Sequence, residues 1–212
     1  EWIRTAPYDP QADVPFAKAM QQQLRIPATT STGSTELSDA AMAIVFDVRL
    51  LAAICKKQYK SRWTLRAVIG AGGSGTVVRA SDKNLQTDVA LKMVRPAKGN
   101  VFGKDEERRL MRESQAMKRV RHSSIPFFHD AFFDMDKTVY VIVMEYVQGD
   151  ALSEVLQSPG GLSQSPVTEV SAELVGAVAA MHAKNIIHLD IKPPNLIYIR
   201  SEDGAHVLKI ID

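Results

Sequence analysis

The chain has 212 residues, 45% of them hydrophobic and 24% charged, a composition ordinary for a globular protein with one large domain or two small ones. Its formal net charge of +2 at pH 7 gives no reason to expect a nucleic acid as partner. Cys55 is the only cysteine, which excludes an internal disulfide and suits an intracellular compartment, most simply the cytoplasm.

The first segment, residues 1–34, is rich in proline and threonine and contains a run of three glutamines. This composition predicts a disordered or irregular tail. A helical extension is expected at 35–60, because acidic residues in its first turn and lysines in its last match the helix dipole. Its middle is apolar on nearly every side. The helix should therefore be buried, either against the following domain or against a regulatory partner.

The same helix contains the longest apolar stretch of the chain, residues 40–55. Asp47 and Arg49 interrupt this stretch, which makes it too short and too charged for a membrane span. Cys55 lies at its end and is expected to be a small buried hydrophobe rather than a nucleophile.

From Trp63 onward, short β-prone runs replace the helical pattern. Turn residues separate the first three runs, which predict strands at 63–70, 76–80 and 87–94. A helix is expected over 105–120, with an apolar side formed by Leu110, Met111, Ala116, Met117 and Val120. The elements expected after it are strands near 127–132 and 139–144, a long apolar helix at 166–183, and a loop followed by a strand hairpin.

A glycine-rich stretch, GAGGSGTV at residues 70–77, has the spacing G-x-G-x-x-G. This spacing allows backbone amides to approach a phosphate, although a flexible loop without a ligand has the same composition. A Walker A loop is excluded because Thr76 stands where that motif needs lysine. A Rossmann turn opens a helix, whereas the β-branched residues after Gly75 favour a second strand. The pattern therefore indicates a strand, a glycine loop and another strand.

Three further motifs occur in order along the chain: VALK at 89–92, HLDIKPPN at 188–195 and IID at 210–212. Together with the glycine loop they resemble the protein kinases, in which V-A-I-K, H-R-D-L-K-x-x-N and D-F-G follow one another. The resemblance covers residues 63–212. Lys192, two residues after Asp190, is similar to the Ser/Thr class rather than to the tyrosine class.

The resemblance implies an α+β, protein-kinase-like fold. A small β-rich lobe with one main helix would span residues 61–146, and a hinge with the first part of a mainly helical large lobe would span 147–212. In this family Gly70, Gly72 and Gly75 would let the loop close over the phosphates of ATP. The other residues that the resemblance assigns to adenine are Val77 and Ala90 as roof, Ile197 as floor, Met144 as gatekeeper, and Glu145 and Val147 through their backbone groups.

The same resemblance assigns the chemistry. Lys92 would hold the α- and β-phosphates and form an ion pair with Glu113, for which an i,i+4 surface pair is the alternative. Asp190 would orient the hydroxyl of a protein substrate and accept its proton, and Lys192 would neutralise the γ-phosphate. The residues expected to bind Mg²⁺ are Asn195 and Asp212.

The chain also departs from the family pattern. Leu189 replaces the arginine of H-R-D and is expected to pack locally, whereas Met117, Phe128 and His188 match the hydrophobic spine. The sequence stops at the Asp of D-F-G. We therefore expect an ATP-dependent Ser/Thr protein kinase, present as an incomplete domain that is inactive on its own. The alternative is a pseudokinase or scaffold that binds nucleotide or partners without catalysis.

Overall fold

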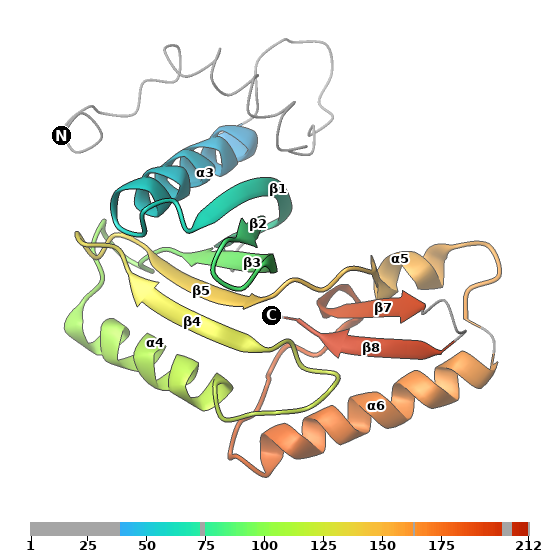
Figure 1. The fold of residues 1–212 in the computed structure, drawn as a ribbon. Helices are drawn as coiled ribbons and strands as arrows, with labels where there is room; N and C mark the ends of the chain where they lie inside the picture. Colours follow the sequence, from blue (N-terminus) through green and yellow to red (C-terminus); the bar gives the residue numbers. More distant parts are fainter. Residues whose placement is uncertain (1–38, 73–74, 163, 201–204, 212) are drawn as a thin grey trace. The chain divides into compact units, whose positions relative to one another are not determined.

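The computed structural model describes residues 39–72, 75–162, 164–200 and 205–211 (Figure 1). The predicted tail at 1–34 and the predicted metal ligand Asp212 lie outside these residues. The elements that follow one another are α3 (Asp39–Lys57), β1 (Trp63–Gly72), β2 (Gly75–Asp82), β3 (Thr87–Val94), α4 (Lys104–Met117), β4 (Phe128–Phe133), β5 (Tyr140–Glu145), β6 (Asp150–Ala151), α5 (Leu152–Gln157), α6 (Gln164–His182), the 3-10 helix η1 (Pro193–Asn195), β7 (Leu196–Arg200) and β8 (His206–Ile210).

The strands form two sheets. Five of them make a sheet in the order β1-β2-β3-β5-β4, and β6, β7 and β8 make a second sheet in that order. The described residues divide into two compact units, 39–102 with 132–142 and 103–131 with 143–211. This α+β architecture, with a β-rich part and helices, confirms the predicted fold class.

In the first unit, α3 packs against β1 and β2 (Figure 1). Alternation along β2 buries Val78 and Ala80, and the paired residues Leu91 and Val89 of β3 are fully buried as well. The side chains that α3 buries are Ala41, Met42, Val45, Val48, Leu51, Ile54 and Cys55. Full burial of one large apolar side chain is worth about 1.5–3 kcal/mol. The larger side chains of this set therefore stabilise the packing of α3 on the sheet, and α3 forms a layer of this unit.

The ends of β1 and β2 are joined through Asp82, which is 1% exposed. Its carboxylate accepts hydrogen bonds from Trp63 Nε1 at 2.8 Å, from Arg62 Nε at 3.1 Å and from the backbone amide of Asn84 at 2.8 Å. Burial raises the pKa of Asp82, but these hydrogen bonds outweigh it and hold the pKa below its usual value. The Trp63 ring also stacks on Phe132 of β4, and the Tyr59 ring lies tilted against both of these rings.

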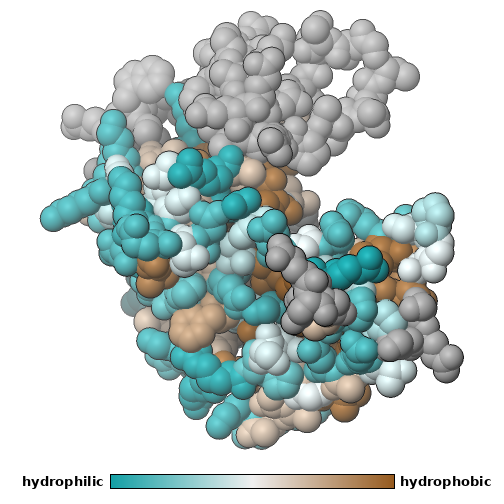
Figure 2. All heavy atoms as spheres, turned by 45° about the vertical axis from the view of Figure 1, so that its right-hand side comes forward, coloured by the Kyte–Doolittle hydropathy of each residue, from teal (hydrophilic) through white to brown (hydrophobic). Residues whose placement is uncertain are grey.

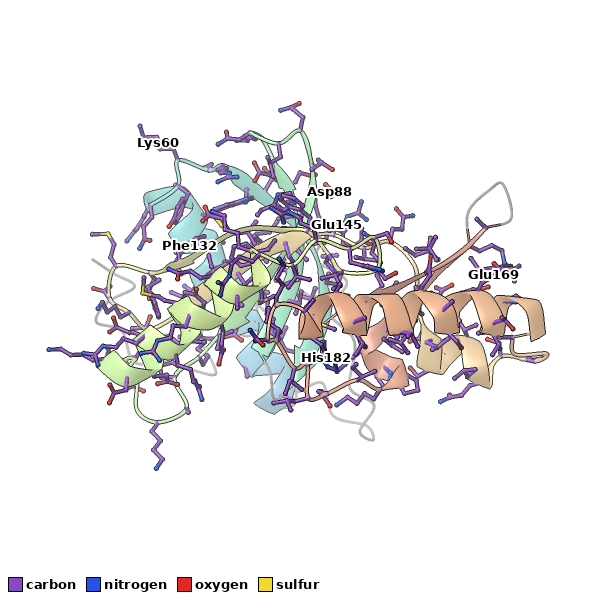
Figure 3. All side chains as sticks on the ribbon, turned by 90° about the horizontal axis from the view of Figure 1, so that it is seen from below. Lys60, Asp88, Phe132, Glu145, Glu169 and His182 are labelled. Atoms are coloured by element: carbon purple, nitrogen blue, oxygen red, sulfur yellow. The ribbon has the colours of Figure 1, made fainter. Side chains whose placement is uncertain are left out.

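In the second unit, α6 packs against β8 of the β7–β8 hairpin (Figure 1). Figure 3 labels Glu169, which lies in the second turn of α6, and His182, at the C-terminal end of the helix. Glu173, between them, accepts a hydrogen bond from the backbone amide of Leu208 at 2.7 Å. The buried core of this unit consists of Val120, Val170, Ala177, Met181, Leu196, Tyr198, Leu208 and Ile210.

The prediction of a helix over 105–120 with a buried apolar side is wrong in part. The helix ends at Met117, and only Leu110 and Ser114 of α4 are buried. Met111 is 52% exposed and Met117 is 40% exposed, so Met117 does not pack in an interior spine. On the face drawn in Figure 2, hydrophilic residues cover much of the described surface, with hydrophobic residues between them. No helix among the described residues is long and apolar enough to cross a membrane.

Candidate nucleotide-binding and catalytic site

The glycine-rich stretch connects two antiparallel strands. Gly72 of β1 is paired with Gly75 of β2, so the chain continues after the loop as a strand and not as a helix. Gly75 has a φ of +119°, and a Cβ placed there would lie 1.9 Å from the carbonyl oxygen of Met93. The backbone conformation of Gly75 and the close approach of β3 therefore both require glycine at this position.

The other two glycines are different. A Cβ at Gly70 would make ordinary contacts of 3.7 Å with Val77, and a Cβ at Gly72 would meet nothing within 4 Å. The packing of the described chain does not demand glycine at either place. Their lack of a side chain leaves space along the hairpin, which a phosphate needs if it is to approach the backbone amides.

The predicted adenine roof and the phosphate-binding lysine share one face of the sheet. Val77 is paired with Lys92 and Arg79 with Ala90, so these residues share one face of the sheet. Thr76, the neighbour of Val77, contacts α3, and side chains alternate along a strand, so this shared face is the one opposite to α3. Burial lowers the pKa of Lys92. A partly buried ammonium group of this kind gains more from a neighbouring phosphate than an ammonium group in water does.

The catalytic loop brings three predicted residues together in the second unit. Lys192 Nζ lies 2.9 Å from Asp190 Oδ2, and Asn195 Nδ2 donates to the same oxygen at 2.8 Å and to the backbone carbonyl of Asp190 at 2.9 Å. The 3-10 helix η1 holds Asn195 in place, because the backbone amide of Asn195 donates to the Lys192 carbonyl at 2.8 Å. The hydrogen bonds from Lys192 and then from Asn195 hold the pKa of Asp190 below its usual value.

Glu145, labelled in Figure 3, lies at the end of β5, and its side chain binds two other residues. Its Oε1 pairs with Lys209 Nζ at 2.5 Å and its Oε2 accepts from the amide of Phe127 at 3.0 Å. The backbone amide of Glu145 also donates to the Phe127 carbonyl at 2.8 Å. Sequence reasoning assigned a task to the backbone of Glu145 only. The signal it missed was a lysine in the middle of the apolar strand β8.

The segment after β5 continues close to β7. A Cβ at Gly149 would lie 2.6 Å from the carbonyl oxygen of Tyr198, so only glycine allows this approach. Ile197 is paired with Ala151 and is half-buried between the buried residues Leu196 and Tyr198. The predicted floor residue and the segment that contains Val147 therefore belong to one small sheet region of this unit.

The strand that leads to Asp212 is fixed at its end. The amide of Ile210 donates to the Ser124 carbonyl at 2.9 Å, and the amide of Ile211 donates to the Asn195 carbonyl at 2.8 Å. The backbone of the residue before Asp212 thus lies beside Asn195. Within the described residues no cluster of three or more His, Cys, Asp or Glu is arranged for a metal ion, and Asp212 lies outside them.

Glu113 is exposed and lies 3.8 Å from Arg109 in an i,i+4 pair on α4. Lys92 belongs to the first unit and Glu113 to the second. An ion pair between these two residues therefore stays a prediction.

Leu189 does not pack locally, in contrast to the prediction. Its side chain is 88% exposed, and its backbone has a φ of +69°. A left-handed conformation is costly for leucine, and burial of the side chain does not offset that cost here. Its neighbours Ile187 and Ile191 are exposed as well, at 68% and 41%.

Comparison with known proteins agrees with this geometry. The protein kinase domain family matches residues 48–212. The chain is 35% identical over 143 residues to serine/threonine-protein kinase PrkC of Bacillus subtilis, an alignment that covers 66% of this chain and 21% of that protein. It is 38% identical over 151 residues to the probable serine/threonine-protein kinase PknB of Corynebacterium glutamicum, with 69% and 23% covered. Serine/threonine-protein kinase PknA of a Nostoc strain is 33% identical over 154 residues, with 70% and 27% covered.

The alignments thus span only about a quarter of the length of these relatives, from 21% to 27%. The family match itself covers most of the chain and includes the glycine hairpin, the strand with Lys92 and the catalytic loop. The chain belongs to the protein kinase family, and these relatives are Ser/Thr kinases.

Proposed function

We propose that this chain is the nucleotide-binding and catalytic part of an ATP- and Mg²⁺-dependent Ser/Thr protein kinase located in the cytoplasm. The complete kinase transfers the γ-phosphoryl group of ATP to a hydroxyl of a protein substrate. The observation that carries the proposal is the cluster of Asp190, Lys192 and Asn195, in which one carboxylate oxygen holds both neighbouring side chains within 2.9 Å. Phosphoryl transfer needs positioning and charge neutralisation more than covalent chemistry, and this cluster supplies both.

Asp190 orients the substrate hydroxyl. Among the described residues, the two side-chain donors that reach its carboxylate both use Oδ2, which leaves Oδ1 as an acceptor for the hydroxyl. The carboxylate is ionised at neutral pH, as an aspartate ordinarily is, and the hydrogen bonds that lower its pKa keep it ionised at lower pH as well. It can therefore accept the hydroxyl hydrogen bond and take up the proton as the phosphoryl group leaves the nucleotide. Lys192, with about half of its side chain exposed at 52%, is near enough to neutralise a transferring phosphate.

The donor set fits a magnesium ion. The amide nitrogen of Asn195 is engaged with Asp190, so its oxygen is the atom left for a cation. Asp212, which follows Ile211, would supply the carboxylate, and hard oxygen ligands of this kind are those that Mg²⁺ prefers. When bound, the ion neutralises charge on the phosphates. Lys92 and the space beside Gly70 and Gly72 would receive the rest of the nucleotide phosphates.

The alternative is a pseudokinase or scaffold that binds nucleotide or partners without catalysis. The two functions are separated by measuring ATP binding and phosphate transfer to a general protein substrate with the full-length protein. We expect Asp190→Asn to leave ATP binding nearly intact and to reduce transfer by at least about a hundredfold, equivalent to about 2.7 kcal/mol in the barrier. Lys92→Met should weaken ATP binding.

A matched control is Asp105→Asn, because the side chain of Asp105 is 98% exposed and its partner among the described residues is Arg108, in an exposed i,i+3 pair. ATP binding by the wild-type protein without any transfer would favour the scaffold. Near-normal turnover by Asp190→Asn would contradict the assigned role. That residues 1–212 are inactive by themselves stays a prediction, which the same assay on the isolated chain checks.

A further inference from the structure

Asp47 lies in the middle of α3 and connects this helix to two parts of the sheet. Thr76 Oγ1 donates to Asp47 Oδ2 at 2.5 Å. Arg95, just after β3, donates to Asp47 Oδ1 from Nε at 3.0 Å and from Nη2 at 2.5 Å. All three residues belong to the first unit. One carboxylate thus binds the beginning of β2 and the end of β3 at the same time.

This arrangement is largely shielded from water. Thr76 is 3% exposed, and the side chains of Asp47 and Arg95 are 16% and 33% exposed. Phe46, the residue before Asp47, adds a second contact, because Arg95 Cζ lies 5.2 Å from the centroid of its ring. A charged group that is buried to this extent is retained only where it is paired, and both oxygens of Asp47 are paired here.

Thr76 occupies a special place in the glycine hairpin. It follows Gly75, whose backbone lies against the Met93 carbonyl, and it precedes Val77, the predicted adenine roof. Thr76 is paired with Met93 at the point where the loop re-enters the sheet. Because its hydroxyl donates to Asp47 of α3, the hydroxyl points to the α3 face. The apolar packing of α3 is not directional. The hydrogen bond from Thr76 is directional, and it fixes the helix to this end of the hairpin.

We propose that Asp47 is a positioning residue for the glycine-rich hairpin, acting through Thr76 from the side of the sheet that does not face the nucleotide. In this view α3 is a built-in support of the nucleotide-binding hairpin. The family match begins at residue 48, so Asp47 falls outside it. The inference rests on the proposed function to the extent that ATP is the ligand of the hairpin.

The test uses the full-length protein and four single substitutions. Thr76→Val removes the hydroxyl at nearly constant size, Thr76→Ser retains it, and Asp47→Asn removes the charge. Asp88→Asn is the control, because Asp88 forms an ion pair with Arg79 between the same two strands, β2 and β3, but away from the hairpin tip. Three quantities are compared for each variant: KM for ATP, kcat, and amide hydrogen exchange over residues 75–80.

We expect Thr76→Val and Asp47→Asn to raise KM for ATP about tenfold, with a smaller effect on kcat. Amide exchange in β2 should accelerate in both variants. Thr76→Ser and Asp88→Asn should resemble the wild type. A double variant, Thr76→Val with Asp47→Asn, should raise KM for ATP no further than Thr76→Val alone, because Asp47 acts on the hairpin through Thr76.

The proposal is overturned if KM stays within about twofold in Thr76→Val and Asp47→Asn, or if Thr76→Ser is as impaired as Thr76→Val. A lowered melting temperature with unchanged KM and exchange would also overturn it, because the contact would then be only structural. If the wild-type protein does not bind ATP, the proposed function fails instead. Hydrogen exchange still decides the positioning role in that case: selective acceleration in Thr76→Val supports it, and identical exchange in Val and Ser variants rejects it.

Discussion

Lys209 and Glu145 form an ion pair between two strands that are far apart in the sequence. Their side chains are 15% and 35% exposed, with Nζ and Oε1 2.5 Å apart. Lys209 lies on the strand that leads to Asp212, and Glu145 lies where β5 ends and the predicted adenine-binding segment begins. The pair therefore connects the predicted nucleotide side of the second unit with the predicted metal side.

Breaking this pair should destabilise the protein by about 1 kcal/mol, because the pair is only partly shielded from solvent. We expect Lys209→Met and Glu145→Gln each to lower the free energy of unfolding measured in urea. The double variant should lose less than the sum, with a coupling of about 0.5–1 kcal/mol. Strictly additive effects would show that the two side chains do not interact in solution.

The pH dependence of activity should not contain an acid limb from Asp190 near neutrality. Hydrogen bonds from Lys192 and Asn195 lower its pKa, so the ionised form is present above the ordinary value of about 3.9 and persists as the pH falls toward the lowered value. We expect NMR titration of the full-length protein to show Asp190 ionised throughout the neutral range. In Lys192→Met the pKa should move upward. A carboxyl that titrates near neutrality in the wild type would contradict this assignment.

The three glycines of the hairpin should respond differently to substitution by alanine. Gly75→Ala should cost about 1–3 kcal/mol in unfolding free energy or more, because its Cβ would lie 1.9 Å from the Met93 carbonyl at a φ of +119°. Gly72→Ala meets nothing within 4 Å and should leave stability nearly unchanged. Its effect should appear in ATP affinity instead. Thermal unfolding and calorimetric titration of both variants separate the two roles, and equal loss of stability would refute the distinction.

Leu189 cannot bind a phosphate, because it has no charge and no hydrogen-bond donor. Its 88% exposed side chain does not belong to the described core, so Leu189→Arg should leave the melting temperature nearly unchanged. We also expect the full-length kinase to keep most of its activity after phosphatase treatment. A loss of about a hundredfold, or about 2.7 kcal/mol in barrier, would show that a phosphate bound elsewhere controls the enzyme.

The elements that could be predicted from sequence are those whose pattern is local. The β-branched residues after Gly75 and the alternation in β3 indicate strands, and both strands are present. The end of α4 could not be placed, because its exposed Met117 has the same helical periodicity as a buried residue. Cys55 was predicted to be buried and is 3% exposed.

The side-chain pairs that position the site were harder to predict. Lys209 and Glu145 are 64 residues apart, and neither strand pattern identifies the other member of the pair. Asp47 was visible only as a charge that interrupts an apolar run. Its partner Thr76 was visible only as a β-branched residue at the position where a Walker A motif would have lysine. In each case the chemistry depends on a contact that local periodicity does not encode.

The position of α3 determines where the protein can be shortened. The family match begins at residue 48, inside this helix, and a version expressed from there would lose Asp47 and the buried residues Ala41, Met42 and Val45. A version that begins at residue 61 would leave Val78, Ala80 and Leu91 on an uncovered sheet face. Such a face promotes self-association. A soluble, well-behaved preparation should therefore begin before Asp39, even though motif-based boundaries would remove the helix.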